Sequence, residues 1–356
     1  MKQKLKQILA KRPKRRSKDP ENSLEQAIRG IPRITNETVA EHREEVLSSA
    51  RKYIYPLQHS AHRVVVISST LAVVGVVAFS TYSILSLYRF NSTSTFIYRV
   101  SQVIPFPVAK AGTNYVSYEN YLFELRHYIH YYQTQQKVDF NSTSGKQQLQ
   151  AFRERALNEV VDSAYVKQLA AKNKISVSGQ EISDQIALIQ AQNGLTNNEK
   201  VFEDVLNEFW GWSIDDFKRE LSQQMLAQKV VDTLDTGTHQ QASAVLAKVQ
   251  AGQDFAALAA QYSQDKNTAA AGGAYGLSIT RTNRDIPAQV VNELFKLQVG
   301  QTSGIINTGT SLEIVKLDDS SAGTVKASHI SFIFNDINTY IKPLRDKEKP
   351  TQYIHP

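Results

Sequence analysis

One long uncharged stretch constrains the fold of this chain most strongly. Residues 64–88, VVVISSTLAVVGVVAFSTYSILSLY, contain no charged side chain, and Arg63 and Arg89 bracket them. About 20 apolar residues are enough for a helix to cross a bilayer. Tyr82 and Tyr88 lie toward one end, where aromatic rings favour the membrane interface. The stretch predicts a single transmembrane helix, with residues 63–89 as a signal anchor; a buried core helix is the alternative.

The basic residues are concentrated before this stretch. Residues 1–63 carry 15 Lys and Arg against 7 Asp and Glu, whereas the rest of the chain carries 26 and 27. Because positive charge favours the cytoplasmic side, we expect residues 1–62 to form a basic cytoplasmic arm and residues 90–356 to lie outside the cell membrane. The arm would contact anionic lipid rather than nucleic acid. A cleavable signal peptide is the weaker alternative, because its charged region would exceed sixty residues.

The chain contains no cysteine, which excludes disulfides, thiolate metal sites and a cysteine nucleophile. This absence suits a protein that works outside the cytoplasm without oxidative folding. His127 and His130 lie three residues apart, a spacing that could hold one metal ion. No H-E-x-x-H motif accompanies them, and tyrosines crowd the same stretch, so a tyrosine-rich packing surface is favoured. We expect no metal and no other cofactor.

The region after the anchor divides by pattern. Residues 90–112 are polar and then contain spaced prolines, which predicts a stalk. Residues 113–236 show apolar side chains at helical spacing, which predicts an all-helical domain. Ser178 followed by Glu181 predicts a capping box at one of these helices. Trp210 and Trp212, in FWGW, are either core residues or part of an exposed aromatic surface that binds other chains.

The order of these segments resembles the amino-terminal chaperone domain of the SurA- and PrsA-type extracytoplasmic foldases. The match is carried by residues 157–182, LNEVVDSAYVKQLAAKNKISVSGQEI, where a helix, a short A-K-x-x-I-x-V-S link and a new helix follow one another. The resemblance implies a domain that binds unfolded or nascent secreted polypeptides.

Residues 237–334 read as a second, α+β domain. Helices are expected near residues 242–249, 255–262 and 290–297, and short strands at residues 305–307 and 312–317. Three segments follow in order: LAKVQAGQDFAALAAQYSQD, then GGAYG, then LFKLQVGQTSG. This ordered set resembles the parvulin family of peptidyl-prolyl isomerases. The resemblance implies a parvulin-like domain with a four-stranded sheet.

The segment VKASHISFIF, residues 325–334, raises a problem of order. It reads as a buried strand and matches the A-S-H-I-L of the family's first strand, but it follows the last expected strand. Either it completes the same sheet from the other end of the chain, or it begins a truncated second parvulin unit. Only residues 335–356, a C-terminal tail, follow it, and an unpaired apolar strand invites aggregation. We therefore predict that it pairs beside residues 312–317 in the centre of the parvulin-like sheet and directs His329 toward Asp265.

The parvulin resemblance also implies site residues. The central histidine falls on His329, the acidic position on Asp265 and the second histidine position on Glu313. The apolar proline pocket falls on Tyr275, Ile286, Val290 and Phe295, and the hydroxyl near the last turn on Thr308. Glu313 departs from the family pattern, as do Tyr275, Ile286 and Val290, where other apolar residues are usual. Both an active prolyl isomerase and a catalytically silent module that binds extended chains therefore remain open.

Overall fold

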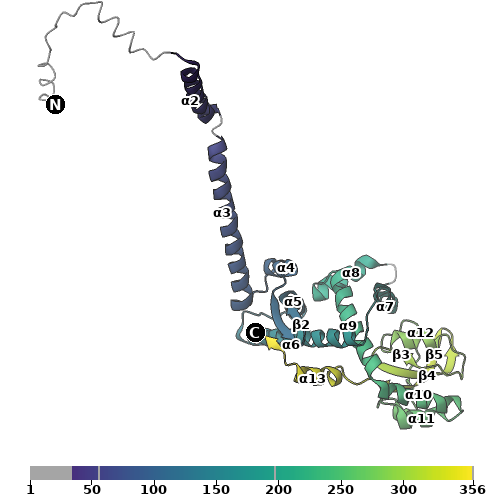
Figure 1. The fold of residues 1–356 in the computed structure, drawn as a ribbon. Helices are drawn as coiled ribbons and strands as arrows, with labels where there is room; N and C mark the ends of the chain where they lie inside the picture. The colour runs from purple at the N-terminus through teal and green to yellow at the C-terminus, as the bar shows by residue number, and fades with distance from the viewer. Residues whose placement is uncertain (1–33, 55–56, 196–197, 355–356) are drawn as a thin grey trace, which may run out of the picture. The chain divides into compact units, whose positions relative to one another are not determined.

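The computed structural model describes residues 34–54, 57–195 and 198–354 of the chain. Most of the basic arm therefore lies outside the described residues. The chain divides into two compact units, residues 1–80 and residues 81–356, and each is described by itself. The ribbon is drawn in Figure 1.

The first unit consists of two helices in its described part, α2 (Asn36–Ile54) and most of α3 (Leu57–Ile84). α3 continues into a short π-helix, η1 (Leu85–Arg89). The helical segment His62–Arg89 is long and apolar enough to cross a membrane, with a mean hydropathy of 2.2. Its valines are largely exposed, for example Val64 at 61% and Val76 at 65%. Exposed apolar side chains on all sides are the pattern of a lipid-facing helix and disagree with the buried core helix considered above.

The second unit begins with a helical lobe, which we define as residues 81–234 and 335–354. Its elements up to residue 234 are α4 (Thr95–Val103), β1 (Pro107–Ala111), β2 (Asn114–Ser117), α5 (Tyr118–Thr134), α6 (Thr143–Lys172), α7 (Gly179–Gln192), α8 (Glu199–Trp210) and α9 (Ile214–Leu234). The predicted capping box of α7 is confirmed, because the Ser178 hydroxyl accepts from the backbone of Glu181 and the Glu181 side chain accepts from the backbone of Ser178.

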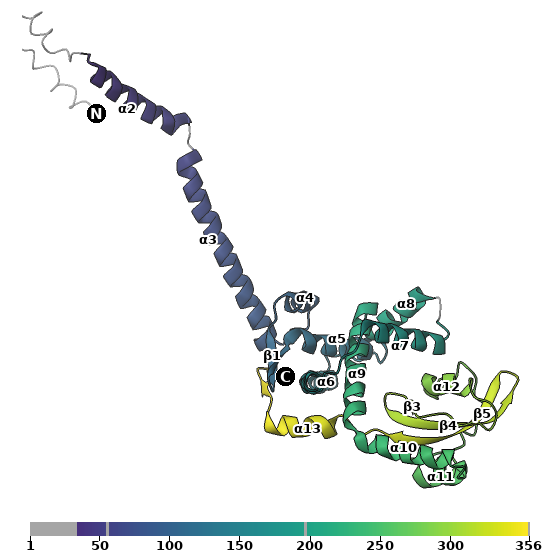
Figure 2. The ribbon, with the colours of Figure 1, turned by 45° about the vertical axis from the view of Figure 1, so that its right-hand side comes forward.

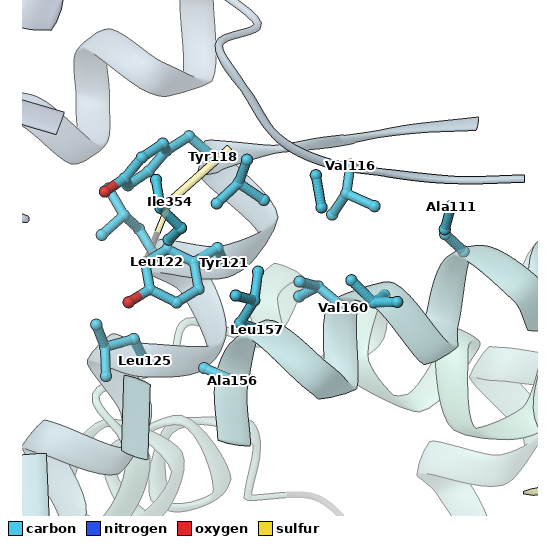
Figure 3. Close-up of a cluster of buried hydrophobic side chains, with 14 of the residues drawn as sticks. Ala111, Val116, Tyr118, Tyr121, Leu122, Leu125, Ala156, Leu157, Val160 and Ile354 are labelled. Carbon is cyan, nitrogen blue, oxygen red and sulfur yellow. The ribbon is translucent and has the colours of Figure 1, made fainter. Parts of the chain in front are cut away.

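Two expectations for this lobe are corrected. The stalk at residues 90–112 is instead folded, because α4 and β1 lie within it and bury Ile97 and Val108 completely. These apolar side chains join the core that α5 and α6 build, so spaced prolines in this segment do not mean an extended spacer. Other residues of this core are shown in Figure 3. The lobe is also not all-helical, since β1 pairs with β2 and with a C-terminal strand, β6 (Thr351–Gln352).

The C-terminal segment is likewise not a tail. After the last strand of the second lobe, the chain forms α13 (Asn338–Lys347) and β6, which return to the helical lobe beside α6 (Figure 1). Ile341 and Ile354 are buried in the same core as Tyr118 and Leu157, and Figure 3 shows Ile354 next to Tyr118. The hydroxyl of Tyr165 donates to the backbone oxygen of Glu348. The helical lobe is therefore built from two segments distant in the sequence.

The sheet lobe, residues 235–334, contains the expected α+β elements. They are α10 (Thr236–Gln250), α11 (Phe255–Tyr262), the short η2 (Ala269–Ala271), α12 (Ala288–Leu294), β3 (Ile306–Asn307), β4 (Ser311–Ser321) and β5 (Thr324–Ile333). The strands form an antiparallel sheet in the order β3-β4-β5. A fourth strand was expected; in its place the segment around residues 274–279 makes only isolated bridges, Ala274 with Ser328 and Ile279 with Val325.

The pairing predicted between residues 325–334 and residues 312–317 is confirmed, but the predicted central position is not, because β5 is the last strand of the sheet and only isolated bridges border its other side. β5 pairs antiparallel with β4, with Leu312 opposite Phe332 and Val315 opposite His329. The connecting turn places Ala322 and Gly323 at φ +43° and +85°, the backbone geometry of a tight hairpin turn. The strand therefore completes the sheet of the same lobe, and no second unit is needed to pair it.

Strand alternation gives the sheet two different faces, which Figure 2 shows with α12 on one side and α10 and α11 on the other. Leu312, Ile314, Ile330 and Phe332 pack toward α10 and α11. The opposite face is divided along its length. Val315, Leu317, Val325 and Ala327 pack against α12, whereas the next positions on this face are Ser311, Glu313, His329 and Ser331. The polar half of this face is where the candidate site lies.

Candidate active site at His329

His329 lies between two carboxylates. Its Nδ1 atom is 3.0 Å from Oε2 of Glu313, and its Nε2 atom is 3.0 Å from Oδ2 of Asp265. The side chains of His329 and Glu313 are each 7% exposed, and that of Asp265 is 26% exposed. The structure thus brings the three polar residues implied by the parvulin resemblance into one hydrogen-bonded row.

β4 and β5 position the buried half of this row. His329 stands opposite Val315, and Glu313 stands opposite Ser331, so Glu313 and His329 are diagonal neighbours on the same face. Oε1 of Glu313 accepts from the hydroxyls of Ser311 and Ser331, each at 2.7 Å. A buried carboxylate is tolerated when hydrogen bonds and a partner group compensate for lost hydration, and Glu313 has both.

The loop after α11 positions the outer half. The Asp265 carboxylate accepts from the backbone N–H of Asn267 and from the hydroxyl of Thr268. The Thr268 hydroxyl is also 2.8 Å from Nε2 of His329. Burial raises the pKa of Asp265, but the hydrogen bonds from Thr268 and Asn267 and the nearby His329 outweigh it and hold the pKa below its usual value. Asp265 is therefore ionised at neutral pH.

Gly273, in the sequence GGAYG, explains how this loop approaches β5 so closely. The backbone N–H of His329 donates to the oxygen of Gly273, whose φ is +84°. A Cβ atom at position 273 would lie 2.2 Å from the backbone oxygen of His329. Only glycine fits both the backbone conformation and the space, so this residue holds the loop against the strand.

An aromatic ring covers the histidine. Tyr275 stacks on His329 with ring centroids 4.2 Å apart and an interplanar angle of 22°. Burial, together with the charges of Glu313 and Asp265, raises the pKa of the Tyr275 hydroxyl, so it stays protonated. The ring places an apolar surface directly beside the polar row.

The expected proline pocket is only partly brought to the surface. Tyr275, Ile286, Val290 and Phe295 share one apolar cluster with α12 and the adjoining strands. Ile286 and Val290 are 3% and 0% exposed and so act as core residues, whereas Tyr275 and Phe295 are partly exposed. The Arg281 guanidinium lies 4.2 Å from the centre of the Phe295 ring. Of the four expected pocket residues, only the two aromatic ones are therefore partly exposed, and Tyr275 is the one that contacts His329.

Thr308 lies in the turn between β3 and β4 and is connected to the site indirectly. Its Oγ1 atom is 2.9 Å from Oγ of Ser311, which in turn donates to Glu313. Ser311, Ser331 and Thr268 were not predicted as site residues. The period-two pattern of S-L-E and H-I-S could have indicated the two serines, because it places them on the same sheet face as Glu313 and His329.

The histidine pair and the tryptophans of the helical lobe lie elsewhere. The ring centroids of His127 and Trp212 are 5.1 Å apart. Nε2 of His130 is 3.0 Å from the backbone oxygen of Glu208. Trp212 stacks between Phe123 and Trp210, and Trp210 is 36% exposed. The tryptophans therefore form a packed aromatic group with one exposed edge, which is intermediate between the two alternatives considered for them.

Comparison with known proteins agrees with both resemblances. Residues 225–319 match the family model for a PPIC-type PPIase domain, and residues 57–231 match the model for a SurA-like N-terminal domain. The PPIase match ends before β5, so the position of His329 comes from the structure and not from that match.

Three relatives illustrate the range of similarity. "Chaperone SurA" of Albidiferax ferrireducens is 31% identical over 134 residues, 33% of this chain and 28% of that protein. "Periplasmic chaperone PpiD" of Escherichia coli K12 is 36% identical over 109 residues, 31% of this chain and 16% of that protein. The crystal structure of PrsA from Bacillus subtilis aligns with 57% of this chain and 79% of that chain at 17% identity, with a TM-score of 0.20. The chain spans less than a third of the length of the two curated relatives.

Proposed function

Because the chain joins a SurA-like N-terminal domain to a PPIC-type PPIase domain, we propose that it is a membrane-anchored, extracytoplasmic peptidyl-prolyl cis-trans isomerase and chaperone that assists the folding of secreted proteins. The observation that supports this most directly is His329, held between Asp265 and Glu313 beneath the ring of Tyr275. Its partners are unfolded or nascent polypeptides with proline-containing segments, and the lipid bilayer holds its anchor.

Prolyl isomerisation requires the protein to bind its substrate selectively and requires no chemical step on a side chain. A prolyl bond isomerises slowly because rotation breaks amide resonance, with a barrier of about 18–20 kcal/mol. Catalysis therefore requires tighter binding of the twisted amide than of the planar one, and no nucleophile. In this proposal the proline ring packs on the aromatic surface of Tyr275 and Phe295. The row of hydrogen bonds through His329 fixes the polar groups beside the amide before it twists, so little reorganisation accompanies the rotation.

A second function, a catalytically silent module that binds extended chains, is favoured by one observation. Both ring nitrogens of His329 already have partners, Nδ1 with Glu313 and Nε2 with Asp265 and Thr268. A histidine with both nitrogens engaged has no free donor to offer a twisted amide. Glu313, at the position where the family has its second histidine, is the reason that Nδ1 is engaged.

A prolyl isomerisation assay separates the two functions. The full chain in lipid nanodiscs would be given a proline-containing tetrapeptide, whose uncatalysed exchange takes tens to hundreds of seconds at 25 °C. The isomerase proposal expects faster exchange, and a loss of at least tenfold in Asp265→Ala, with the exposed neighbour Lys266→Ala as the matched control. If the chain binds the peptide but isomerisation proceeds at the uncatalysed rate, the silent binding module is the function that stands. If the chain neither binds the peptide nor accelerates its isomerisation, both functions are contradicted.

The membrane anchor supports the proposed location. The segment His62–Arg89 has the length and composition of a membrane span. The excess of Lys and Arg before it favours a cytoplasmic amino terminus, which places residues 90–356 outside. An anchored foldase in this orientation would meet secreted chains as they leave the membrane.

A further inference from the structure

A groove runs beside an edge strand of the helical lobe. The small sheet has the order β2-β1-β6, so β2 is paired on one side only. A groove of about 380 Å³ is lined by β2 together with residues of α5, α6 and α9. Among the residues that the structure describes, none from β1 or β6 lines it. The groove therefore borders β2, the strand with a free edge, and neither of the other two strands.

β2 keeps unpaired backbone groups along this groove. In an antiparallel pair, alternate residues direct N–H and C=O to opposite sides, so about half of the backbone groups of β2 point away from β1. Within the described ranges, the backbone hydrogen bonds of residues 114–116 reach only β1. Proteins commonly protect such edges with Lys, Pro or a bulge. The sequence NYVS of β2 has neither residue, and the irregularity of this hairpin lies between Pro107 and Ala109 of β1.

The side chains of the groove suit a polypeptide. Its floor is apolar, formed by Val116, Val160 and Ala164. Figure 3 shows Val116 and Val160 on the strand and on α6. Ser163 and Ala171 on the same side of α6 are small, and this leaves the space beside the strand open. Tyr115 is 67% exposed, and the Lys110 ammonium lies 5.5 Å from the centre of its ring.

One charge at the rim indicates which segments fit best. Lys167 lines the groove and is exposed, and none of the ion pairs found among the described residues includes it. Its pKa is lowered, first by burial and then by the charge of Arg219, while the charges of Glu119 and Glu124 act in the opposite direction. An acidic or neutral segment is favoured over a basic one.

We propose that this groove binds one extended polypeptide segment as an added strand on β2. The proposal rests on the proposed chaperone function and assigns the place where the helical lobe holds its client. The four residues of β2 span about 13 Å, the length of a single short strand segment. Main-chain hydrogen bonds supply affinity that depends little on sequence, which suits clients of unrelated sequence and requires no proline.

Fluorescence anisotropy with a proline-free probe tests the proposal. The probe is fluorescein-labelled Glu-(Val-Thr)3-Glu, and the protein is the full chain in nanodiscs. Ala171→Trp fills the groove and is expected to weaken binding at least tenfold. Ala151→Trp, at another exposed position on α6, is the matched control and should bind like wild type. The same probe methylated at every internal amide nitrogen keeps its side chains but has no backbone donor, and it should also bind at least tenfold more weakly.

Three outcomes would overturn the proposal. They are equal binding by Ala171→Trp and Ala151→Trp, equal binding of the methylated probe, and a dimer in sedimentation velocity that Ala171→Trp alone converts to a monomer. The last would show that a second copy, rather than a client, occupies the groove. A bulky residue at Ser163 repeats the test if Ala171→Trp lowers the urea midpoint. The probe lacks proline, so the binding test does not depend on the result of the isomerase assay. If the wild-type chain isomerises prolyl bonds but does not bind the probe, the groove proposal is wrong and the proposed isomerase function stands.

Discussion

At the scale of the residue, Glu313 determines the character of the site. Its two oxygens accept from Ser311 and Ser331 and contact His329, and the side chain is almost fully buried. In a low-dielectric environment each of these contacts is stronger than in water. For the same reason, losing one of them lowers the stability of the folded protein more than it would at an exposed site. Glu313 is thus a structural support for the histidine, and the parvulin resemblance implies a second histidine at its position.

Glu313→Gln should destabilise the protein by about 1–3 kcal/mol, because the amide removes the charge beside His329 and replaces one acceptor with a donor. Urea unfolding followed by fluorescence measures the change. The control is Asp319→Asn on the same strand, an exposed position whose pairing with Lys326 spans 4.0 Å, and it should stay within about 0.5 kcal/mol of wild type. Equal midpoints for the two variants would show that the carboxylate is not needed for folding.

Asp235 joins the two lobes at a single carboxylate. It caps α10 through the backbone N–H of Thr238, and its Oδ2 accepts from the backbone and side chain of Asn335, where the chain leaves the sheet lobe. Burial raises its pKa, but these hydrogen bonds outweigh burial and leave the pKa below its usual value. The two points at which the chain passes between the lobes are therefore held together by one residue.

Because the folded-state pKa of Asp235 is lowered, its contribution to stability is present above the unfolded pKa of about 3.9 and is lost as the pH falls through the lower folded value. Asp235→Asn should therefore be less stable than wild type at pH 7, and the difference should shrink below about pH 4. Unfolding by urea at a series of pH values measures it. A difference between the two proteins that does not depend on pH would contradict this assignment of the carboxylate.

At the scale of the element, the returning C-terminal segment is the least expected feature. α13 and β6 complete the helical lobe by adding Ile341 and Ile354 to its core and a strand to β1. Deleting residues 325–356 would therefore remove β5 from one lobe and a core segment from the other. We expect both lobes to lose stability in that truncation, rather than the sheet lobe alone.

A single substitution tests the contribution of β6 and its neighbours. Ile354→Ala should cost about 2–5 kcal/mol, because Ile354 is 2% exposed and its removal leaves a cavity in the core of the helical lobe. The adjacent Tyr353→Ala, at 41% exposure, should cost much less. Thermal unfolding of the two variants measures this contrast, and similar melting temperatures would mean that the end of the chain is not part of the core.

At the scale of the whole molecule, the proposed membrane anchor would determine where the chain works. Protease added to the outer face of intact cells or spheroplasts should degrade the region after residue 90 and spare the basic arm, because the excess of positive charge lies before the helix. Immunoblotting with tags at the two ends of the chain distinguishes the products. Protection of the C-terminal tag with loss of the N-terminal one would reverse the proposed orientation and contradict the proposed role with secreted clients.

The sequence alone determined the features that depend on local patterns. The uncharged run predicted a membrane-spanning helix, the capping box at Ser178 identified a helix start, and the apolar pattern of residues 325–334 predicted a strand. The ordered glycine and apolar motifs also indicated both family resemblances. These signals are readable because each depends on neighbours in the chain or on a regular period.

Only the tertiary structure decided what depends on contacts between distant residues. It folded the expected stalk and tail into one core, because Ile97 and Ile354 find partners in α5 and α6 that no local pattern reveals. It added Ser311, Ser331 and Thr268 to the site. These residues belong to it because their hydroxyls contact Glu313 or His329, which the fold brings next to them. It also left β2 at the edge of a sheet, because strand order follows from long-range packing and not from the four residues of the strand itself.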